Sequence, residues 1–175
     1  MKVLTLLRHA KSGWDDPVTR DFDRPLNRRG RRAAATIGRE MRRLALGFDT
    51  VIASPARRVV ETLEEVEQAF GTLAIHYDER LYLAAPETLL EVARATDDGV
   101  GRLLLAGHNP GLEELVLRLS APGALRAEAE IKYPTATLAE MRFDVPSWRQ
   151  LRDGGATLAR FIRPRDLDPE LGPEE

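Results

Sequence analysis

The sequence predicts an α/β protein in which a mainly parallel sheet carries helices on both faces. Three observations lead to this prediction. Short apolar or β-branched runs, the first of which is Val3–Leu7, alternate along the chain with segments whose apolar residues recur at steps of three and four. Hydrophobic residues make up 43% of the chain, as in globular proteins. The length of 175 residues suits one domain with a sizeable core.

The expected strands are short runs of apolar and β-branched residues bounded by polar or turn-forming residues. In chain order they are Val3–Leu7, Asp49–Ala53, Leu73–Tyr77, Arg102–Ala106, Thr135–Phe143 and Ala156–Ile162. The last two would pair near a sheet edge, around a turn at residues 153–155.

The expected helices lie between these strands. In chain order they begin at about Arg28, at Ser54 or Pro55, at Pro86 and at about Gly111. Asn27 is a capping residue for the first of them, which would run to about Ala45. The spacing of their apolar residues predicts that each helix buries one face.

One domain is expected over residues 1–163. A long polar loop, Ser12–Asn27, follows its first strand. The last twelve residues, PRDLDPELGPEE (164–175), are acidic and rich in proline, and we expect them to form a tail or a loose strap.

The composition excludes several classes of protein. A formal net charge of −2 argues against a nucleic-acid-binding protein. The absence of cysteine excludes disulfides, thiolate catalysis and cysteine-ligated metals. No apolar run approaches the roughly 20 residues of a membrane span, and the N-terminus lacks the apolar core of a signal peptide. A cytoplasmic protein with no membrane contact is therefore expected.

Polar side chains with catalytic potential follow three of the expected strands. Arg8 and His9 end the first, the segment from Ser54 to Arg58 follows the second, and His108 follows the fourth. Because ligands bind at the carboxyl ends of parallel strands, these residues are expected to share one site. Arginine side chains and helix N-termini favour an anionic, tetrahedral ligand such as phosphate.

Two histidines beside a phosphate site suggest covalent chemistry. A neutral imidazole is a nucleophile at pH 7 and can form a phosphoryl adduct. The second imidazole, if protonated, would add positive charge where the transition state spreads negative charge. The sequence has no metal-binding motif and no glycine-rich phosphate loop, and this chemistry needs neither a metal ion nor a cofactor. His76 lies within an expected strand, away from the site.

These segments resemble the histidine phosphatase superfamily, which includes the phosphoglycerate mutases. LLRHAKSGW resembles its Arg-His signature, SPARRVVET its second phosphate-binding segment with Ser54, Arg58 and Thr62 at the matching positions, and GHNPGLEEL the segment that carries the second histidine. Within the superfamily the likeness is greatest to the short SixA-like phosphohistidine phosphatases, because DFDRPLNRRGRRAA, ERLYLAAPETLL and KYPTATLA also match. The likeness covers about residues 1–163.

The resemblance implies a three-layer α/β/α sandwich of the phosphoglycerate mutase-like kind. His9 would be the nucleophile, and Arg8, Arg58 and His108 would complete the phosphate pocket. Water would then hydrolyse the phosphohistidine intermediate. The implied substrate is phosphohistidine on a histidine phosphotransfer or carrier protein. A small-molecule phosphomonoesterase of broad specificity and a non-catalytic phosphate-binding module are the alternatives.

One departure from the family concerns the carboxylic acid that protonates the leaving oxygen in mutases and many phosphatases. The matching position here is Tyr82 or Leu83. An alkoxide leaving group has a conjugate acid with a pKa of about 15.7, whereas for imidazole the value is roughly 6.5. A missing acid therefore fits a phosphohistidine substrate. The carboxylates that could still fold into the site are Asp15, Asp16, Asp21, Asp23 and Glu79.

Several other polar residues have two interpretations. Ser12 and Asn109 are expected to contact phosphate, although each could instead serve a loop or a turn. Lys11 and Arg24 could contact phosphate or the partner, or could have only local roles. Arg57 is expected to be a solvated helix residue.

Overall fold

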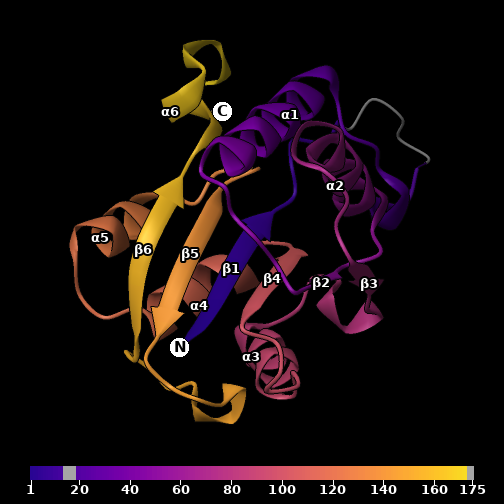
Figure 1. Ribbon diagram of the computed structural model, residues 1–175. Coiled ribbons are helices and arrows are strands. Elements are labelled where there is room, and N and C mark those ends of the chain that lie inside the picture. The colour runs from indigo at the N-terminus through magenta and orange to yellow at the C-terminus, as the bar shows by residue number, and fades with distance from the viewer. Residues whose placement is uncertain (14–18, 173–175) are drawn as a thin grey trace.

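A computed structural model describes residues 1–13 and 19–172, and its centre is a six-stranded sheet (Figure 1). The strands are β1 Lys2–Arg8, β2 Thr50–Ala53, β3 Ile75–Tyr77, β4 Arg102–Gly107, β5 Leu138–Phe143 and β6 Ala156–Ile162. Their order across the sheet is β3-β2-β4-β1-β5-β6. The first four are parallel, whereas β5 is antiparallel to β1 and β6 to β5. The mainly parallel sheet with a late pair at one edge is confirmed.

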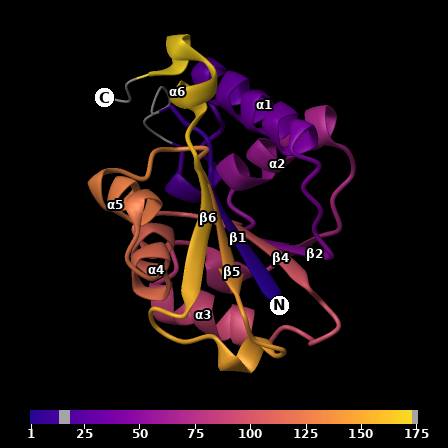
Figure 2. The same ribbon diagram turned by 60° about the vertical axis from the view of Figure 1, so that its left-hand side comes forward.

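Helices cover both faces of the sheet, so the predicted three-layer arrangement is confirmed (Figure 2). The α-helices are α1 Arg28–Arg43, α2 Arg57–Phe70, α3 Pro86–Arg94, α4 Gly111–Leu119, α5 Ala124–Ile131 and α6 Pro164–Leu167. The 3-10 helices are η1 Asp21–Asp23, η2 Glu79–Leu81, η3 Trp148–Gln150 and η4 Pro169–Leu171. Helices α1 and α2 pack on one face, and α3, α4 and α5 on the other.

The two apolar cores follow from the alternation of side chains along the strands. In β4, Leu103 and Leu105 belong to the core under α3 and α4, and Leu104 and Ala106 to the core under α1 and α2. All four are buried. Each buried leucine contributes roughly 1.5–3 kcal/mol, so the central strands, whose ends carry the polar residues, are held firmly.

The start of α1 matches the sequence prediction. The Asn27 side chain accepts a hydrogen bond from the backbone N–H of Gly30 at 2.8 Å, as a capping residue does. Gly30 also permits a close approach, because a Cβ at this position would lie 2.0 Å from the carbonyl oxygen of Lys11. The first turn of α1 is therefore packed directly onto the loop that follows β1.

The C-terminal segment differs from the expected tail or loose strap. Over residues 164–172 it forms α6 and η4 and packs against α1, with Leu171 buried. The guanidinium of Arg32 pairs with the carboxylates of Asp168, at 2.8 Å, and Glu170. Burial of Leu171 and the ion pairs of Arg32 thus hold this segment against α1, although its composition predicts little regular structure.

Helix α5 is absent from the sequence prediction, and Ala129 is its one fully buried residue. None of the helices in the described part of the chain is both long and apolar enough to cross a membrane.

Candidate active site

The carboxyl ends of three adjacent strands meet at one edge of the sheet. His9 follows β1, Ser54 follows β2 and His108 follows β4. The imidazole rings of His9 and His108 have centroids 5.3 Å apart. The structure therefore brings together residues that lie up to about 100 positions apart in the sequence.

His9 is half-buried and has the tautomer that a nucleophile requires. Its Nδ1 lies 2.7 Å from the carbonyl oxygen of Ala10, and since a carbonyl only accepts, Nδ1 carries the proton. The lone pair of Nε2 is therefore free. Burial lowers the pKa of His9 well below its usual range; the Ala10 hydrogen bond opposes this effect, and His108, Arg58 and Arg8 add to it. The imidazole is neutral at pH 7.

Thr62 of α2 fixes the backbone just after His9. Its Oγ1 accepts a hydrogen bond from the N–H of Ala10 at 2.9 Å and donates one to the carbonyl of Arg58 at 2.6 Å. Both Thr62 and Ala10 are buried. One hydroxyl thus joins the His9 loop to the helix that carries Arg58.

Arg58 is a buried cation whose planar group is held at several points. Nη1 donates to the carbonyl of Asp21 at 2.7 Å, and Nη2 donates to the Asp21 carboxylate at 3.1 Å and to Nδ1 of His108 at 3.2 Å. Its buried Nε–H has no hydrogen-bond partner within residues 1–13 and 19–172. An unpaired buried donor is costly and calls for an explanation, and a bound anion would satisfy it.

His108 is neutral in this arrangement. Because Arg58 donates to its Nδ1, the proton lies on Nε2, which donates to the Ser54 hydroxyl at 2.8 Å. Burial, followed by the charge of Arg58, lowers the pKa of His108 to about 3. The His108 ring therefore carries no positive charge in the absence of a ligand. A bound phosphate dianion would raise the pKa of His108 and favour its protonated form.

Arg8 and Asn109 donate hydrogen bonds to the same backbone carbonyl. Nη1 of Arg8 and Nδ2 of Asn109 donate to the carbonyl of Tyr133, at 2.9 and 3.1 Å. Oδ1 of Asn109 accepts from the N–H of Glu113 and so stabilises the first turn of α4. These contacts show the turn role of Asn109, and its contact with phosphate stays a prediction.

Ser12 and Arg24 also lie beside the site. The Arg24 guanidinium donates to the Ser12 hydroxyl at 2.6 Å and to the Asp21 carboxylate at 3.1 Å. The predicted contact of Ser12 with phosphate stays a prediction as well.

Among the described residues, Asp21 is the carboxylate that the fold brings to the site. It accepts hydrogen bonds from the hydroxyl of Tyr82, from Arg58 and from Arg24. Partial burial alone would raise its pKa, but these donors outweigh that effect and lower the pKa to about 2. Burial and the Asp21 carboxylate raise the pKa of Tyr82. At neutral pH Asp21 is therefore an anion and the proton stays on Tyr82, whose ring centroid lies 5.4 Å from that of His108.

The other carboxylates considered from the sequence are placed differently. Asp23 pairs with Arg20 at 2.9 Å, and Glu79 is exposed in η2. Asp15 and Asp16 lie outside the described residues. No feature of the sequence separates Asp21 from these four, because its contacts come from distant segments.

Two further expectations concern single residues. Arg57 is exposed and pairs with Glu61 at 3.0 Å, as expected of a solvated helix residue. His76 lies exposed in β3, at the edge of the sheet away from β1.

The site carries an excess of positive charge. Arg8, Arg24 and Arg58 are cations, Asp21 is an anion, and both imidazoles are neutral. A phosphoryl dianion would balance the charge of these side chains. In the part of the chain that the structure describes, no three His, Cys, Asp or Glu side chains are grouped so as to hold a metal ion.

Comparison with known proteins identifies the class. Residues 4–82 match the family model described as the histidine phosphatase superfamily (branch 1). The uncharacterized protein Rv1276c of Mycobacterium tuberculosis strain H37Rv is 38% identical over 164 residues, which cover 91% of this chain and 100% of that protein.

Two solved structures have the same fold. The one from Agrobacterium tumefaciens, which bears the name "putative phosphohistidine phosphatase SixA", is 30% identical, with a TM-score of 0.79 over 92% of this chain and 97% of that chain. The one from Nakamurella multipartitia, which has the same name, is 28% identical, with a TM-score of 0.78 over 93% of this chain and 96% of that chain. The chain belongs to the histidine phosphatase superfamily, in its SixA-like branch.

Proposed function

We propose that the protein hydrolyses phosphohistidine on a partner protein through a covalent phosphohistidine intermediate on His9. The observation that carries this proposal is the free Nε2 of a neutral His9, beside a cationic site with an unpaired buried N–H on Arg58. A nucleophile and an anion site lie together, as phosphoryl transfer requires. The names of the similar structures support phosphohistidine as the substrate class.

In the first step, Nε2 of His9 attacks phosphorus and forms a new P–N bond. The P–N bond to the substrate imidazole breaks, and its electron pair stays on the departing nitrogen. The substrate imidazole leaves in its neutral form when its other ring nitrogen carries a proton from solvent. Arg8 and Arg58 stabilise the charge on the phosphoryl oxygens during the transfer.

In the second step, a water molecule attacks the phosphorus of phospho-His9. The P–N bond breaks, inorganic phosphate is released, and one proton of the water passes to solvent. His9 returns to its neutral state. The hydrogen bond from Nδ1 to Ala10 holds the ring in place through both steps.

The described residues place no suitable acid at the site, which favours this substrate class over sugar phosphates. Asp21 has a pKa of about 2 and so is ionised, while Tyr82 has a raised pKa and donates its proton to Asp21. Neither can protonate an alkoxide readily near pH 7. An imidazole, with a conjugate-acid pKa of roughly 6.5, leaves without such help.

Dephosphorylation of a histidine-phosphorylated carrier protein, with EDTA present, tests the proposal. We expect phosphate release by the wild type and none by His9→Ala, while His76→Ala, which alters an exposed histidine on β3, behaves as wild type. Turnover of an aryl phosphate without turnover of the carrier would support the small-molecule phosphomonoesterase instead. Phosphate binding without turnover, unaffected by His9→Ala, would support the non-catalytic module.

A further inference from the structure

We propose that a basic pocket beside the His9 loop binds an acidic side chain of the phosphorylated partner protein. This inference rests on the proposed function and adds a specificity subsite to it. The pocket lies between the loop after β1, the first turns of α1, the loop before β5 and the C-terminal segment. The hollow is shallow, and the space in it that admits a water-sized sphere measures about 20 Å³.

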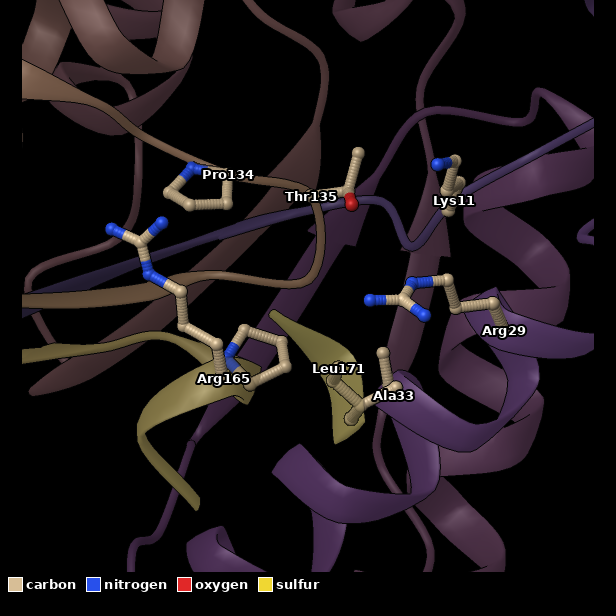
Figure 3. A pocket seen from close by; sticks show the side chains of 8 residues that line it. Lys11, Arg29, Ala33, Pro134, Thr135, Arg165 and Leu171 are labelled. Carbon is tan, nitrogen blue, oxygen red and sulfur yellow. The ribbon is translucent and has the colours of Figure 1, made fainter. Parts of the chain in front are cut away.

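Three cations line this pocket, and no carboxylate lines it within residues 1–13 and 19–172. Figure 3 shows Lys11 and Arg29 on one side, Arg165 on the other and Thr135 between them. The guanidinium of Arg29 points toward the middle of the view.

The fold sets these cations in place. Because Gly30 lets α1 lie directly against Lys11, Arg29 is held beside the loop that follows His9. Arg29 donates to the carbonyl of Gly172 at 3.3 Å, and a Cβ on Gly172 would meet the side chain of Arg165 at 3.0 Å. The C-terminal segment thus places Arg165 across the pocket from Arg29, with its guanidinium directed away from the middle of the view in Figure 3.

The acidic residues of the C-terminal segment that the structure describes are paired with other arginines. Asp168 and Glu170 pair with Arg32, and Asp166 pairs with Arg163 at 2.9 Å. Within the described residues, Lys11, Arg29 and Arg165 form no ion pair. The pocket is therefore positive while the protein as a whole has a formal charge of −2.

The pocket lies beside the segment that carries His9. Lys11 is two residues beyond His9, and Thr135 precedes Ala136, whose N–H donates to the carbonyl of His9 at 3.0 Å. A protein that presents phosphohistidine to His9 would therefore lay neighbouring residues over this pocket. Charge complementarity selects Asp or Glu at such a position.

Peptides with a stable, non-hydrolysable phosphohistidine analogue test this assignment. One peptide carries glutamates on both sides of the analogue, and its partner carries glutamines. Each is measured as a competitive inhibitor of aryl phosphate hydrolysis by the wild type. We expect the acidic peptide to bind about fivefold more tightly, as for one or two partly exposed ion pairs. This preference should vanish near 1 M salt, where the screening length is about 3 Å.

The double variant Arg29→Gln/Arg165→Gln should reduce the preference to about one, and Arg165→Gln alone should reduce it in part. Arg28→Gln is the matched control, because Arg28 is an exposed arginine of the same helix turn that does not line the pocket. It should retain the preference.

Equal binding of the two peptides by the wild type, or an undiminished preference in the double variant, would refute the proposed subsite. Either result would leave the proposed function untouched. If inorganic phosphate inhibits but neither peptide does, the proposed substrate class falls and the subsite with it. The comparison within the wild type is decisive even if the double variant does not fold.

Discussion

Replacement of Thr62 by valine would test how the fold holds His9, the proposed nucleophile. Valine has nearly the shape of threonine but lacks its hydroxyl. The change removes the acceptor of the Ala10 N–H, at 2.9 Å, and the donor to the Arg58 carbonyl, at 2.6 Å. Because Ala10 is buried, its N–H is left without a partner.

The expected loss of stability follows from that unpaired group. A buried donor without a partner costs about 1–3 kcal/mol, so we expect the free energy of unfolding to fall by about 2 kcal/mol. In a chain of this size this corresponds to a drop of about 4–8 °C in Tm. Ala10 also accepts the hydrogen bond that orients His9, so turnover of an aryl phosphate should fall about tenfold to a hundredfold.

Thr36→Val is the matched control for this prediction. Thr36 is buried in α1 and donates to the carbonyl four residues earlier at 2.8 Å, as Thr62 does. Its hydroxyl accepts from the Arg39 guanidinium at 3.1 Å and, within the described residues, from no backbone N–H of another segment. Its loss should therefore cost about 0.5–1 kcal/mol and leave turnover intact. Urea unfolding and steady-state turnover would be measured on both variants. Equal losses of stability in the two variants, or unchanged turnover in Thr62→Val, would refute the conclusion that the Thr62 hydroxyl holds the His9 loop in place.

Three other predictions concern charge. Because the pKa of His9 is lowered below its usual value of roughly 6.5, kcat/KM should not decline as the pH falls through that value, but only in more acidic solution. Half-maximal activity at or above pH 6.5 would contradict this. The unfolded chain binds a proton at His108 near pH 6.5, whereas the folded protein does so only at about 3. The free energy of unfolding, followed by urea titration, should therefore be greatest above pH 6.5 and fall as the pH is lowered toward 3, and a pH-independent value would exclude this linkage. Asp21→Asn removes a negative charge beside Arg58 and should lower the Ki for inorganic phosphate several-fold, with Asp23→Asn as the control; an unchanged Ki would show that Asp21 does not oppose anion binding.

The parts of the fold that depend on local pattern could be predicted from the sequence. The apolar run after Lys2 forms β1, and Asn27 caps α1. Helix α5 could not be predicted, because it buries only Ala129 fully and has no capping side chain. The C-terminal segment was also unpredictable, since its order depends on Leu171 and on Arg32, which is more than 130 residues away.

The site also combines features that the sequence could predict with features that depend on contacts between distant segments. Residues that leave parallel strands at one sheet edge could be placed together by a topological rule, as His9 and His108 were. The choice of Asp21 among five carboxylates could not be made, because it depends on how the loop before α1 folds over Arg58. The neutral state of His108 also required the structure, since it follows from burial and from the Arg58 contact.

The most direct measurement is the location of a covalent phosphoryl group. A carrier protein labelled with ³²P on histidine would be mixed with the enzyme, and the reaction would be quenched with alkali within milliseconds. We predict an acid-labile, alkali-stable label on His9, absent from His9→Ala and unchanged in His76→Ala. A label on another residue, or turnover of the carrier by His9→Ala, would contradict the assignment of His9 as the nucleophile.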